Sequence, residues 1–493
     1  MHTIEKKSIK KGWAGAIAEP AKEFPLTQLP ILSGKIPDGL RGTLYRNGPA
    51  RLERGDDCVG HWFDGDGAIL GVHFTDAGVT GVYRYVQTAE YEAETKADRF
   101  LYGVYGMHTP GPIWKRWGQQ MKNAANTSVL ALPDKLLALW EATNPYALDL
   151  ETLETKGLDD LGALDNGLPY SAHYKRDPDT GEIFNFGISI GSSVQLNLYK
   201  SDACGGLRQP TGKIIQKAAF KLDRYSIMHD FVLTQRYLVF FMPPMRMKML
   251  SLMLGMTTFS ESLLWEPQLG TQVLIFDREN LSLVSRGETD PWFNWHFGNG
   301  YEDEDGSVIL DVVRYSDFQQ TNEYLREIAT GETHTVPKGR LWQVRLNPQT
   351  AKVTATQEVI NRRCEFPVVQ RSQVGQPWRY TYVSLMRQGT DTGEELFGAI
   401  ARFDYKTETL TEADLGENRY PSEPIHAQDA QNPEQSWVLT VVYDGNSHSS
   451  EVWVFDSDRL DTEPVCKLGL PSVIPHSFHG TWNPASALPL RFP

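Results

Sequence analysis

One short pattern recurs along the chain and constrains its fold more than any other feature. An apolar strand is followed by an Asp or Asn, a few turn residues and a second strand, and the copies centre on Asp149, Asp177, Asp277, Asn347, Asp404 and Asp456. An Asp or Asn can accept hydrogen bonds from the backbone of its own turn, and the flanking β-branched and aromatic residues suit pleated strands. Each copy therefore predicts a β-hairpin.

The spacing of these hairpins indicates how they are assembled. Most intervals are about 50 to 70 residues, and the longer one after Asp177 has room for a further copy around Asp202. Seven four-stranded units in a chain with little helical periodicity favour a radial repeat. The sequence thus predicts an all-β fold, a seven-bladed β-propeller. Because the repeat is degenerate, two or three β-sandwiches in series remain the alternative.

We expect residues 1–493 to form this single propeller domain, with residues 1–35 as an N-terminal extension. The best helical candidate is the segment 113–126, which carries cationic and amide residues at mixed spacing. A few helices and loops are expected to form a dome over the axial site.

Charge and cysteine content exclude several classes of function. The chain has 48 Lys and Arg against 62 Asp and Glu, a formal net charge of −14, which is too acidic for a dedicated nucleic-acid binder. The four cysteines form no CxxC pair, so neither a disulfide framework nor a thiolate zinc site is indicated. Without a secretory signal or an 18-residue apolar run, we expect a cytoplasmic protein, and no protein partner is inferred.

The segment 242–265 is compositionally unusual because it holds six of the eleven methionines. Two interpretations remain open. It is an irregular packed loop filled by adaptable thioethers, or it is an apolar collar that admits a long hydrophobic substrate and contacts a membrane surface peripherally, with Arg246 and Lys248 facing the headgroups.

Two short motifs resemble known functional loops but fit other structures better. Residues 187–191 (GISIG) match the nucleophile elbow of hydrolases, yet the residues that follow alternate like a strand, whereas the elbow requires a helix. Residues 63–71 resemble a glycine-rich phosphate loop, but their spacing differs and no helix start follows. We interpret the second segment as a turn.

Four of the twelve histidines occupy similar places, each in or beside a β-rich segment with turn residues nearby: His173, His229, His296 and His479. The inner strand of each propeller blade lines the central axis, so histidines from four blades can converge on one ion. Imidazole is a ligand for Zn, Cu, Fe and Ni alike, so the pattern does not identify the metal.

At these residues the chain resembles the carotenoid cleavage oxygenases, seven-bladed propeller enzymes that split conjugated double bonds with O2 at a non-haem Fe(II). The resemblance is closest to the cyanobacterial apocarotenoid and carotenoid oxygenases. It extends through most of the chain in the family's order, in the motifs GTLYRNGP (42–49), HWFDGDG (61–67), KNAANT (122–127), LLALWE (136–141), SAH (171–173), MHDF (228–231), HxxNxxE (296–302), RRCEFP (362–367), SEP (422–424) and HGTW (479–482).

The resemblance implies one Fe(2+) per chain, bound by His173, His229, His296 and His479. It also implies three second-layer carboxylates that accept the Nδ1 protons of ligand imidazoles: Glu141 with His229, Glu365 with His296, and Glu423 with His479. His173 would have no carboxylate partner. We expect all three glutamates to be buried, where their charge offsets that of the dication.

The same resemblance implies the substrates and the reaction. O2 and a hydrophobic polyene, a carotenoid or apocarotenoid, would give aldehydes without a protein base. A threonine near the open metal positions corresponds to Thr127, and the expected wall residues of the substrate tunnel are Tyr105, Trp140, Trp295 and Phe297, together with the methionine segment.

Two alternative functions are retained. The stilbene-cleaving branch of the same fold shares Tyr105 but has a Lys immediately before the glutamate that corresponds to Glu141. Here that residue is Trp140, so the phenolate clamp is incomplete and a hydrocarbon polyene is favoured. The second alternative is a propeller that only binds ligands, and it predicts loss of the metal-binding histidines.

Overall fold

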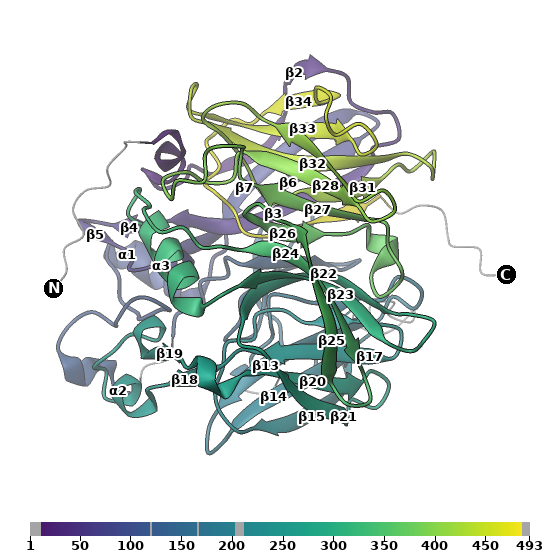
Figure 1. Ribbon diagram of the computed structural model, residues 1–493. Coiled ribbons are helices and arrows are strands. Elements are labelled where there is room, and N and C mark those ends of the chain that lie inside the picture. Colours follow the sequence, from purple (N-terminus) through teal and green to yellow (C-terminus); the bar gives the residue numbers. More distant parts are fainter. Residues whose placement is uncertain (1–10, 119–120, 165–166, 203–211, 486–493) are drawn as a thin grey trace.

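The computed structural model describes residues 11–118, 121–164, 167–202 and 212–485. Seven antiparallel sheets are arranged in a ring (Figure 1), which confirms the predicted seven-bladed β-propeller. The segment expected to hold the turn after Asp202 lies partly outside the described residues, at 203–211. No helix in the described part of the chain is both long and apolar enough to cross a bilayer.

The first three blades use strands from the N-terminal half of the chain together with one from its C-terminal end. Blade 1 contains β35 (Gly480–Pro484), β3 (Gly42–Arg51), β6 (Asp66–Thr75), β7 (Gly78–Tyr85) and β1 (Phe24–Gln28). Blade 2 contains β8 (Ser128–Ala131), β9 (Leu136–Leu139), β10 (Tyr146–Leu148) and β11 (Thr155–Leu158). Blade 3 contains β12 (Lys175–Arg176), β13 (Ile183–Ile190), β14 (Val194–Ser201) and β15 (Ile214–Leu222).

The remaining blades follow in chain order. Blade 4 contains β16 (Val232–Leu233), β17 (Tyr237–Met242), β20 (Thr271–Asp277) and β21 (Leu283–Thr289). Blade 5 contains β22 (Phe293–Glu302), β23 (Val308–Tyr315), β24 (Arg340–Asn347) and β25 (Lys352–Ile360). Blade 6 contains β26 (Cys364–Val368), β27 (Tyr380–Leu385), β28 (Ala399–Asp404) and β29 (Thr409–Asp414). Blade 7 contains β30 (Arg419–Pro421), β31 (Ile425–Gln428), β32 (Ser436–Asp444), β33 (Ser449–Asp456), β34 (Cys466–Gly469) and β2 (Ile31–Gly34).

The ring is closed by strands from both ends of the chain. β35 pairs with β3 in blade 1, and β2 pairs with β34 at the edge of blade 7, beside the C-terminal strands in Figure 1. Residues 1–35 are therefore not a separate extension, because β1 and β2 are outer strands of two neighbouring blades. Residues 1–10 lie outside the described residues.

The recurring Asp and Asn residues do form the turns that the sequence pattern predicts. Oδ1 of Asp149 accepts hydrogen bonds from the backbone N–H groups of Glu151 and Thr152, both at 3.0 Å. The same contact recurs at Asp277, Asn347, Asp404 and Asp456, always between the third and fourth strands of a blade. Asp177 is the exception, because its turn joins β12 and β13, the first two strands of blade 3.

The prediction of a helix at 113–126 is wrong. Only Ile113–Arg116 forms a short 3-10 turn, η3, and the described residues from 121 to 126 form neither helix nor strand. The polar residues of this segment do not share one solvent-exposed face. Lys122 is buried between the carboxylates of Asp66 and Glu94, and Asn126 donates to the carbonyl of Gly65 at 2.7 Å.

The α-helices lie instead in the connections outside the blades. α1 (Ala89–Ala97) begins at Thr88, whose hydroxyl accepts from the N–H of Tyr91, and α3 (Phe318–Ile328) begins at Asp317, which caps it in the same way. Together with α2 (Met249–Met253) and the hairpin β18 (Met245–Met247) and β19 (Leu263–Trp265), they lie on one side of the sheets in Figure 1. Short 3-10 turns complete the connections: η1 (Gly12–Ile17), η2 (Trp62–Asp64), η5 (Ser260–Ser262), η6 (Pro267–Leu269) and η7 (Arg371–Gln373). The small hairpin of β4 (Glu53–Arg54) and β5 (Asp57–Cys58) also lies outside the blades.

A buried carboxyl group joins blades 5 and 6. Asp311 on β23 accepts hydrogen bonds from the hydroxyl of Thr381 on β27, at 2.7 Å, and from that of Tyr405, at 2.6 Å. Burial raises the pKa of Asp311 to about 7, although both hydroxyls oppose this shift. At pH values between about 4 and about 7, Asp311 is thus protonated in the folded protein and ionised in the unfolded chain.

We expect this proton uptake to make stability depend on pH. The contribution of Asp311 to the free energy of unfolding should fall as pH rises from about 4 to about 7, because this carboxyl binds a proton in the folded state and not in the unfolded chain. Asp311→Asn removes this contribution, so the stability advantage of the unaltered protein over the variant should be larger at pH 5 than at pH 8, measured as urea midpoints. Asp64, whose pKa burial also raises to about 7, and the buried histidines, whose pKa values burial lowers, contribute equally in both proteins and cancel in this comparison. Asp461→Asn, at an exposed position, is the control; an equal advantage over Asp311→Asn at both pH values would contradict the assignment.

Candidate metal centre

Four histidines from four different blades meet on the propeller axis. His173 and His229 lie just before β12 and β16, His296 lies in β22, and His479 immediately precedes β35. These are the inner strands of blades 3, 4, 5 and 1, and they line an axial cavity with the inner strands of the other blades. The histidines that the sequence analysis selected are thus brought together, although up to 183 residues separate consecutive members.

The imidazoles point their Nε2 atoms at one another. The Nε2 atoms of His173 and His229 are 2.9 Å apart, and those of His296 and His479 are 3.1 Å apart. One ligand atom from each of the four lies within 4.8 Å of the others. A metal with bonds of about 2.1 Å to imidazole nitrogens would place neighbouring nitrogens about 3.0 Å apart and opposite ones about 4.2 Å apart. The cluster is therefore of a size that fits one ion.

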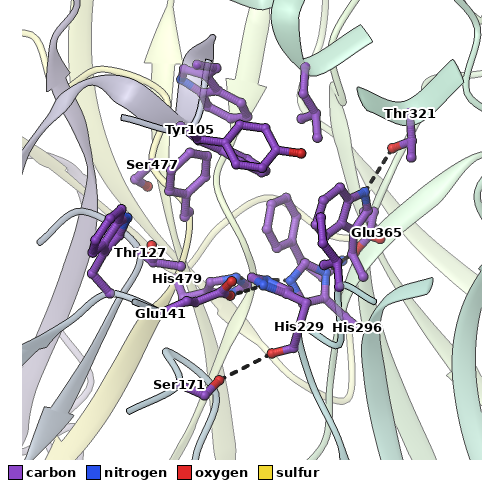
Figure 2. A pocket seen from close by; sticks show the side chains of 18 of the residues that line it. Tyr105, Thr127, Glu141, Ser171, His229, His296, Thr321, Glu365, Ser477 and His479 are labelled. Atoms are coloured by element: carbon purple, nitrogen blue, oxygen red, sulfur yellow. Dashed lines mark hydrogen bonds and ion pairs between the residues drawn. The ribbon is translucent and has the colours of Figure 1, made fainter. Parts of the chain in front are cut away.

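Carboxylates fix the orientation of three of the rings. Nδ1 of His296 is 2.5 Å from Oε2 of Glu365, and Nδ1 of His479 is 2.9 Å from Oε1 of Glu423. Nδ1 of His229 contacts Oε1 of Glu141 (Figure 2). A carboxylate accepts the Nδ1 proton, so each of these Nε2 atoms carries a lone pair.

The three glutamates differ in burial. Glu365 and Glu423 are buried, as expected, but the side chain of Glu141 is 38% exposed. The expectation that Glu141 is buried between Trp140 and Ala142 is wrong, because β9 ends at Leu139 and Glu141 begins a turn at the cavity wall.

In the part of the chain that the structure describes, no carboxylate lies within hydrogen-bond distance of Nδ1 of His173. The nearest carboxylate oxygen, Oδ1 of Asp230, is 3.9 Å from its Nδ1. Asp230 is engaged by other donors, since Lys175 Nζ lies 2.9 Å from it and the N–H of Phe297 donates to it at 2.9 Å. The fourth ring therefore lacks the anionic partner that the other three have.

Three glutamates would give the site three negative charges against the two positive charges of a dication. Ion pairs in the surroundings reduce this excess. Glu423 also binds the buried guanidinium of Arg46 at 3.0 Å, and Asp230 is paired with Lys175. These two pairs are internally neutral. Among the described residues, Glu141 and Glu365 are the two carboxylates in contact with ligand rings without a Lys or Arg partner of their own, and their charge equals that of one M²⁺ ion.

Burial keeps two of the four rings neutral without a metal, and a carboxylate acts in the opposite direction on a third. Burial lowers the pKa of His479 to about 4 and that of His173 well below its usual range. Burial lowers the pKa of His296 too, but the Glu365 carboxylate outweighs it and the net shift is upward. Neutral imidazoles whose lone pairs face each other at about 3 Å repel one another, and a shared cation removes that repulsion.

The cluster lies between two cavities. The first, about 480 Å³, is lined mainly by apolar and aromatic side chains, and His229, His296 and His479 line it as well. The second, about 570 Å³, follows the propeller axis and is lined by His173, His296 and His479. Figure 2 shows the first cavity, with Tyr105 across it from the histidines.

The first cavity collects most of the residues that the sequence analysis selected for the tunnel. Tyr105, Thr127, Trp140 and Trp295 line it. The Thr127 hydroxyl is hydrogen-bonded to Oδ1 of Asn126 at 3.0 Å. Phe297 is not among its lining residues, because alternation along β22 turns it away from His296 and it packs 5.7 Å from the ring of Phe241.

The segment 242–265 contributes less to this cavity than we expected. Met242, Met245 and Met247 are buried in the protein core, and Phe259 is the residue of this segment that lines the cavity. Residues 187–191, which resemble a nucleophile elbow, lie at the end of β13 and its turn into β14, so they form no strand-to-helix turn.

Sequence reasoning missed two side chains, one that contacts a histidine of the cluster and one that contacts a glutamate beside it. Phe366 stacks on His296 with ring centroids 5.4 Å apart and has a backbone φ of 56°, unusual for a residue other than glycine. Arg46, buried beside Glu423, is the second. Both lie in motifs quoted above, but nothing in the residue types indicated these contacts.

Comparison with known proteins agrees with this geometry. The family model described as retinal pigment epithelial membrane protein matches residues 17–484. Apocarotenoid-15,15'-oxygenase of Synechocystis sp. is 32% identical over 463 residues, which cover 92% of each chain. Resveratrol cleavage oxygenase 1 of Aspergillus fumigatus is 27% identical and isoeugenol monooxygenase of Pseudomonas putida is 26% identical, each over more than 90% of both chains.

Solved structures give the same result. A glutamate-to-glutamine variant of the Synechocystis apocarotenoid oxygenase superposes with a TM-score of 0.88 at 29% identity, covering 97% of this chain and 100% of that one. The cobalt-substituted form of the Synechocystis enzyme gives 0.86 at 30% identity, with 96% and 98% covered. The chain belongs to the carotenoid oxygenase family, as its motifs predicted.

We expect removal of one ring to abolish metal binding. His479→Ala should lose nearly all bound metal, because three imidazoles would remain and Glu423 would have no ring to orient. Elemental analysis of protein purified with added iron(II) measures this. His334→Ala is the control, since His334 is an exposed histidine away from the cluster. Stoichiometric metal in His479→Ala would remove His479 from the site.

Replacing Glu365 and Glu423 with glutamine should have different effects on the stability of the protein. Glu365→Gln should lower metal affinity by about 10- to 100-fold with little loss of stability, because its other partners are Tyr315 and the N–H of Phe366. Glu423→Gln should also lower thermal stability, since it leaves buried Arg46 without its counter-ion. Metal titration and thermal melts measure the two effects; equal stability losses would contradict this distinction.

Proposed function

We propose that this protein is a non-haem Fe(II) dioxygenase that cleaves a conjugated carbon–carbon double bond of a carotenoid or apocarotenoid with O2 and forms two aldehydes. The observation that carries the proposal is the group of four inward-facing imidazoles beside an apolar cavity of about 480 Å³. A transition metal is also found in the family, since one solved structure of the Synechocystis enzyme is described as cobalt-substituted.

The metal and the protein have separate roles in this reaction. Bound iron(II) supplies the redox-active centre at which O2 becomes reactive toward an alkene. Each carbon of the cleaved bond receives one oxygen atom of O2, so the reaction balances without a separate reductant. His173, His229, His296 and His479 bind the ion, and the three glutamates hold the rings in the correct tautomer.

The cavity walls position the substrate. Aromatic side chains contact a polyene through their faces and edges, and a polyene needs few hydrogen bonds. Trp295 packs edge-on against His229, with ring centroids 5.3 Å apart, and its indole N–H is satisfied by Thr321 at 2.9 Å. Its ring can therefore hold a hydrocarbon next to the metal without leaving a polar group unpaired.

A phenolic substrate is the second candidate, because relatives named for resveratrol cleavage and isoeugenol oxidation also match. Tyr105 lines the cavity, but its hydroxyl already donates to Oδ1 of Asn322 at 2.8 Å. Trp140 precedes Glu141 and brings no cation. These two features favour the polyene.

We also propose a peripheral membrane contact, at a surface that includes part of the segment 242–265. Leu250, Met253, Leu254 and Met256 are exposed there, and the neighbouring turn adds exposed Ile113, Trp114 and Trp117. Two hydrogen bonds join these segments, from Arg116 to the Gly255 carbonyl and from Trp117 to the Leu254 carbonyl, both 2.9 Å. Exposed Lys115, Arg246 and Lys248 suit anionic headgroups.

Substrate choice tests the main proposal directly. The iron-loaded protein should bleach an apocarotenal under air and give two aldehydes, identified by chromatography and mass spectrometry, but should leave a hydroxystilbene largely intact. Trp140→Lys should raise turnover of the hydroxystilbene, since it supplies the missing cation. Cleavage of the hydroxystilbene alone by the unaltered protein would replace the polyene with a phenolic substrate.

The exposed apolar surface should matter only when the substrate is in a bilayer. Leu250→Glu combined with Met253→Glu should reduce co-sedimentation with anionic vesicles and cleavage of vesicle-bound substrate, while cleavage in detergent is retained. Leu158→Glu is the matched control, because Leu158 is 63% exposed on β11, the edge strand of blade 2. Equal losses in vesicles and detergent would contradict a membrane role.

A further inference from the structure

One polar group in the first cavity takes no part in holding the metal ligands. His476 lies between β34 and β35 and lines the cavity. Its Nε2 is 2.8 Å from the carbonyl oxygen of Trp13. A carbonyl oxygen only accepts, so Nε2 carries the ring proton, and Nδ1 of the neutral ring is a hydrogen-bond acceptor. No donor to this Nδ1 is found among the described residues.

The ring is held in a box of aromatic side chains. Trp13, Tyr420 and Tyr443 surround His476 at centroid distances of 6.3, 5.9 and 5.8 Å, and both tyrosines are nearly perpendicular to it. Burial lowers the pKa of His476 to about 4, so the ring is neutral at physiological pH. The box thus presents an uncharged acceptor among apolar faces.

The other polar atoms of this box are already paired. The indole N–H of Trp13 donates to the carbonyl of Glu394 at 3.0 Å, and the hydroxyl of Tyr420 donates to the Glu395 carboxylate at 3.0 Å. The Tyr443 hydroxyl is 2.9 Å from Nδ1 of a histidine on the adjacent turn, residue 448. Nδ1 of His476 is the acceptor that these contacts leave free.

The aromatic box forms one end of the cavity, and the opposite end lies on the other side of the propeller axis. Tyr420 and Tyr443 belong to β30 and β32 of blade 7, whereas Ile190 at the far wall ends β13 of blade 3. His229, His296 and His479 line the cavity between these walls. A long molecule whose central part lies beside the histidines therefore places one terminus at the His476 box.

We propose that His476 accepts a hydrogen bond from a hydroxyl group on the terminal ring of the substrate, so that the protein selects a hydroxylated polyene over the matching hydrocarbon. This inference rests on the proposed function. The aromatic box receives the apolar terminal ring, and the free Nδ1 distinguishes a hydroxyl from hydrogen. A carbonyl or ether oxygen at the same place offers no proton and gains nothing from this acceptor.

Binding to the metal-free protein tests the inference without turnover. The probes are two apocarotenals of equal length that differ only in a hydroxyl on the terminal ring. The unaltered protein should bind the hydroxylated probe about 3- to 10-fold more tightly, the range of one net hydrogen bond. His476→Phe should bring this ratio to about one and leave the affinity for the other probe nearly unchanged.

Two further variants separate the acceptor from the shape of the box. His476→Asn replaces Nδ1 with an amide oxygen at a similar position, so it should recover part of the preference. Tyr443→Phe removes a hydroxyl bonded within the protein and should keep the full preference. Damage to the cavity that weakens binding of both probes equally does not change the ratio of their affinities, so the ratio reports the hydroxyl contact alone.

Equal affinity of the unaltered protein for the two probes overturns the inference, and this comparison needs no variant. Retention of the preference in His476→Phe overturns it as well. If the iron-loaded protein cleaves both probes and yet binds them equally, only the role of His476 fails. If neither probe binds or is cleaved, the proposed function fails with it.

Discussion

The geometry of this site depends on four imidazole Nε2 atoms that are aimed at one point. Facing ring nitrogens about 3 Å apart repel one another unless a proton or a cation lies between them, so rigid elements must hold the rings in place. Each histidine lies at or beside the inner strand of a different blade. In three of them, a contact between Nδ1 and a carboxylate fixes the orientation of the ring. The propeller supplies the rigidity, since each blade is packed between two neighbours and the ring is closed by β2 and β35.

The electrostatics of the centre follow from the same constraint. A dication ligated only by neutral groups needs nearby negative charge, and a buried negative charge needs a partner. Pairing of Glu423 with Arg46 and of Asp230 with Lys175 leaves Glu141 and Glu365 as the balancing charges. Glu141 is the more exposed of these two carboxylates, and both line the first cavity.

Much of the fold could be predicted because its turns use local chemistry. Asp149 and its equivalents bond the backbone two and three residues ahead, a contact readable in sequence. The short segment 113–126 misled the prediction because its polar residues are buried one by one in separate networks, and helical periodicity carries no information about such contacts. The extent of the N-terminal segment was also missed, since pairing of β2 with β34 joins residues more than 400 positions apart.

The four histidines could be identified from their similar local contexts and from the family motifs, but their surroundings could not. Phe297 faces blade 4, whereas its neighbour His296 faces the axis. This difference follows from the register of β22, which the sequence around Phe297 does not reveal. Arg46, Phe366 and His476 act through contacts with distant segments, which residue types alone do not specify.

X-ray absorption at the iron edge of the reconstituted protein measures which atoms bind the ion. We expect one iron per chain with four nitrogen scatterers at about 2.1 Å and the outer-shell pattern of imidazole rings. A spectrum with two or fewer imidazoles, or with carboxylate or sulfur as the main ligands, would contradict this expectation.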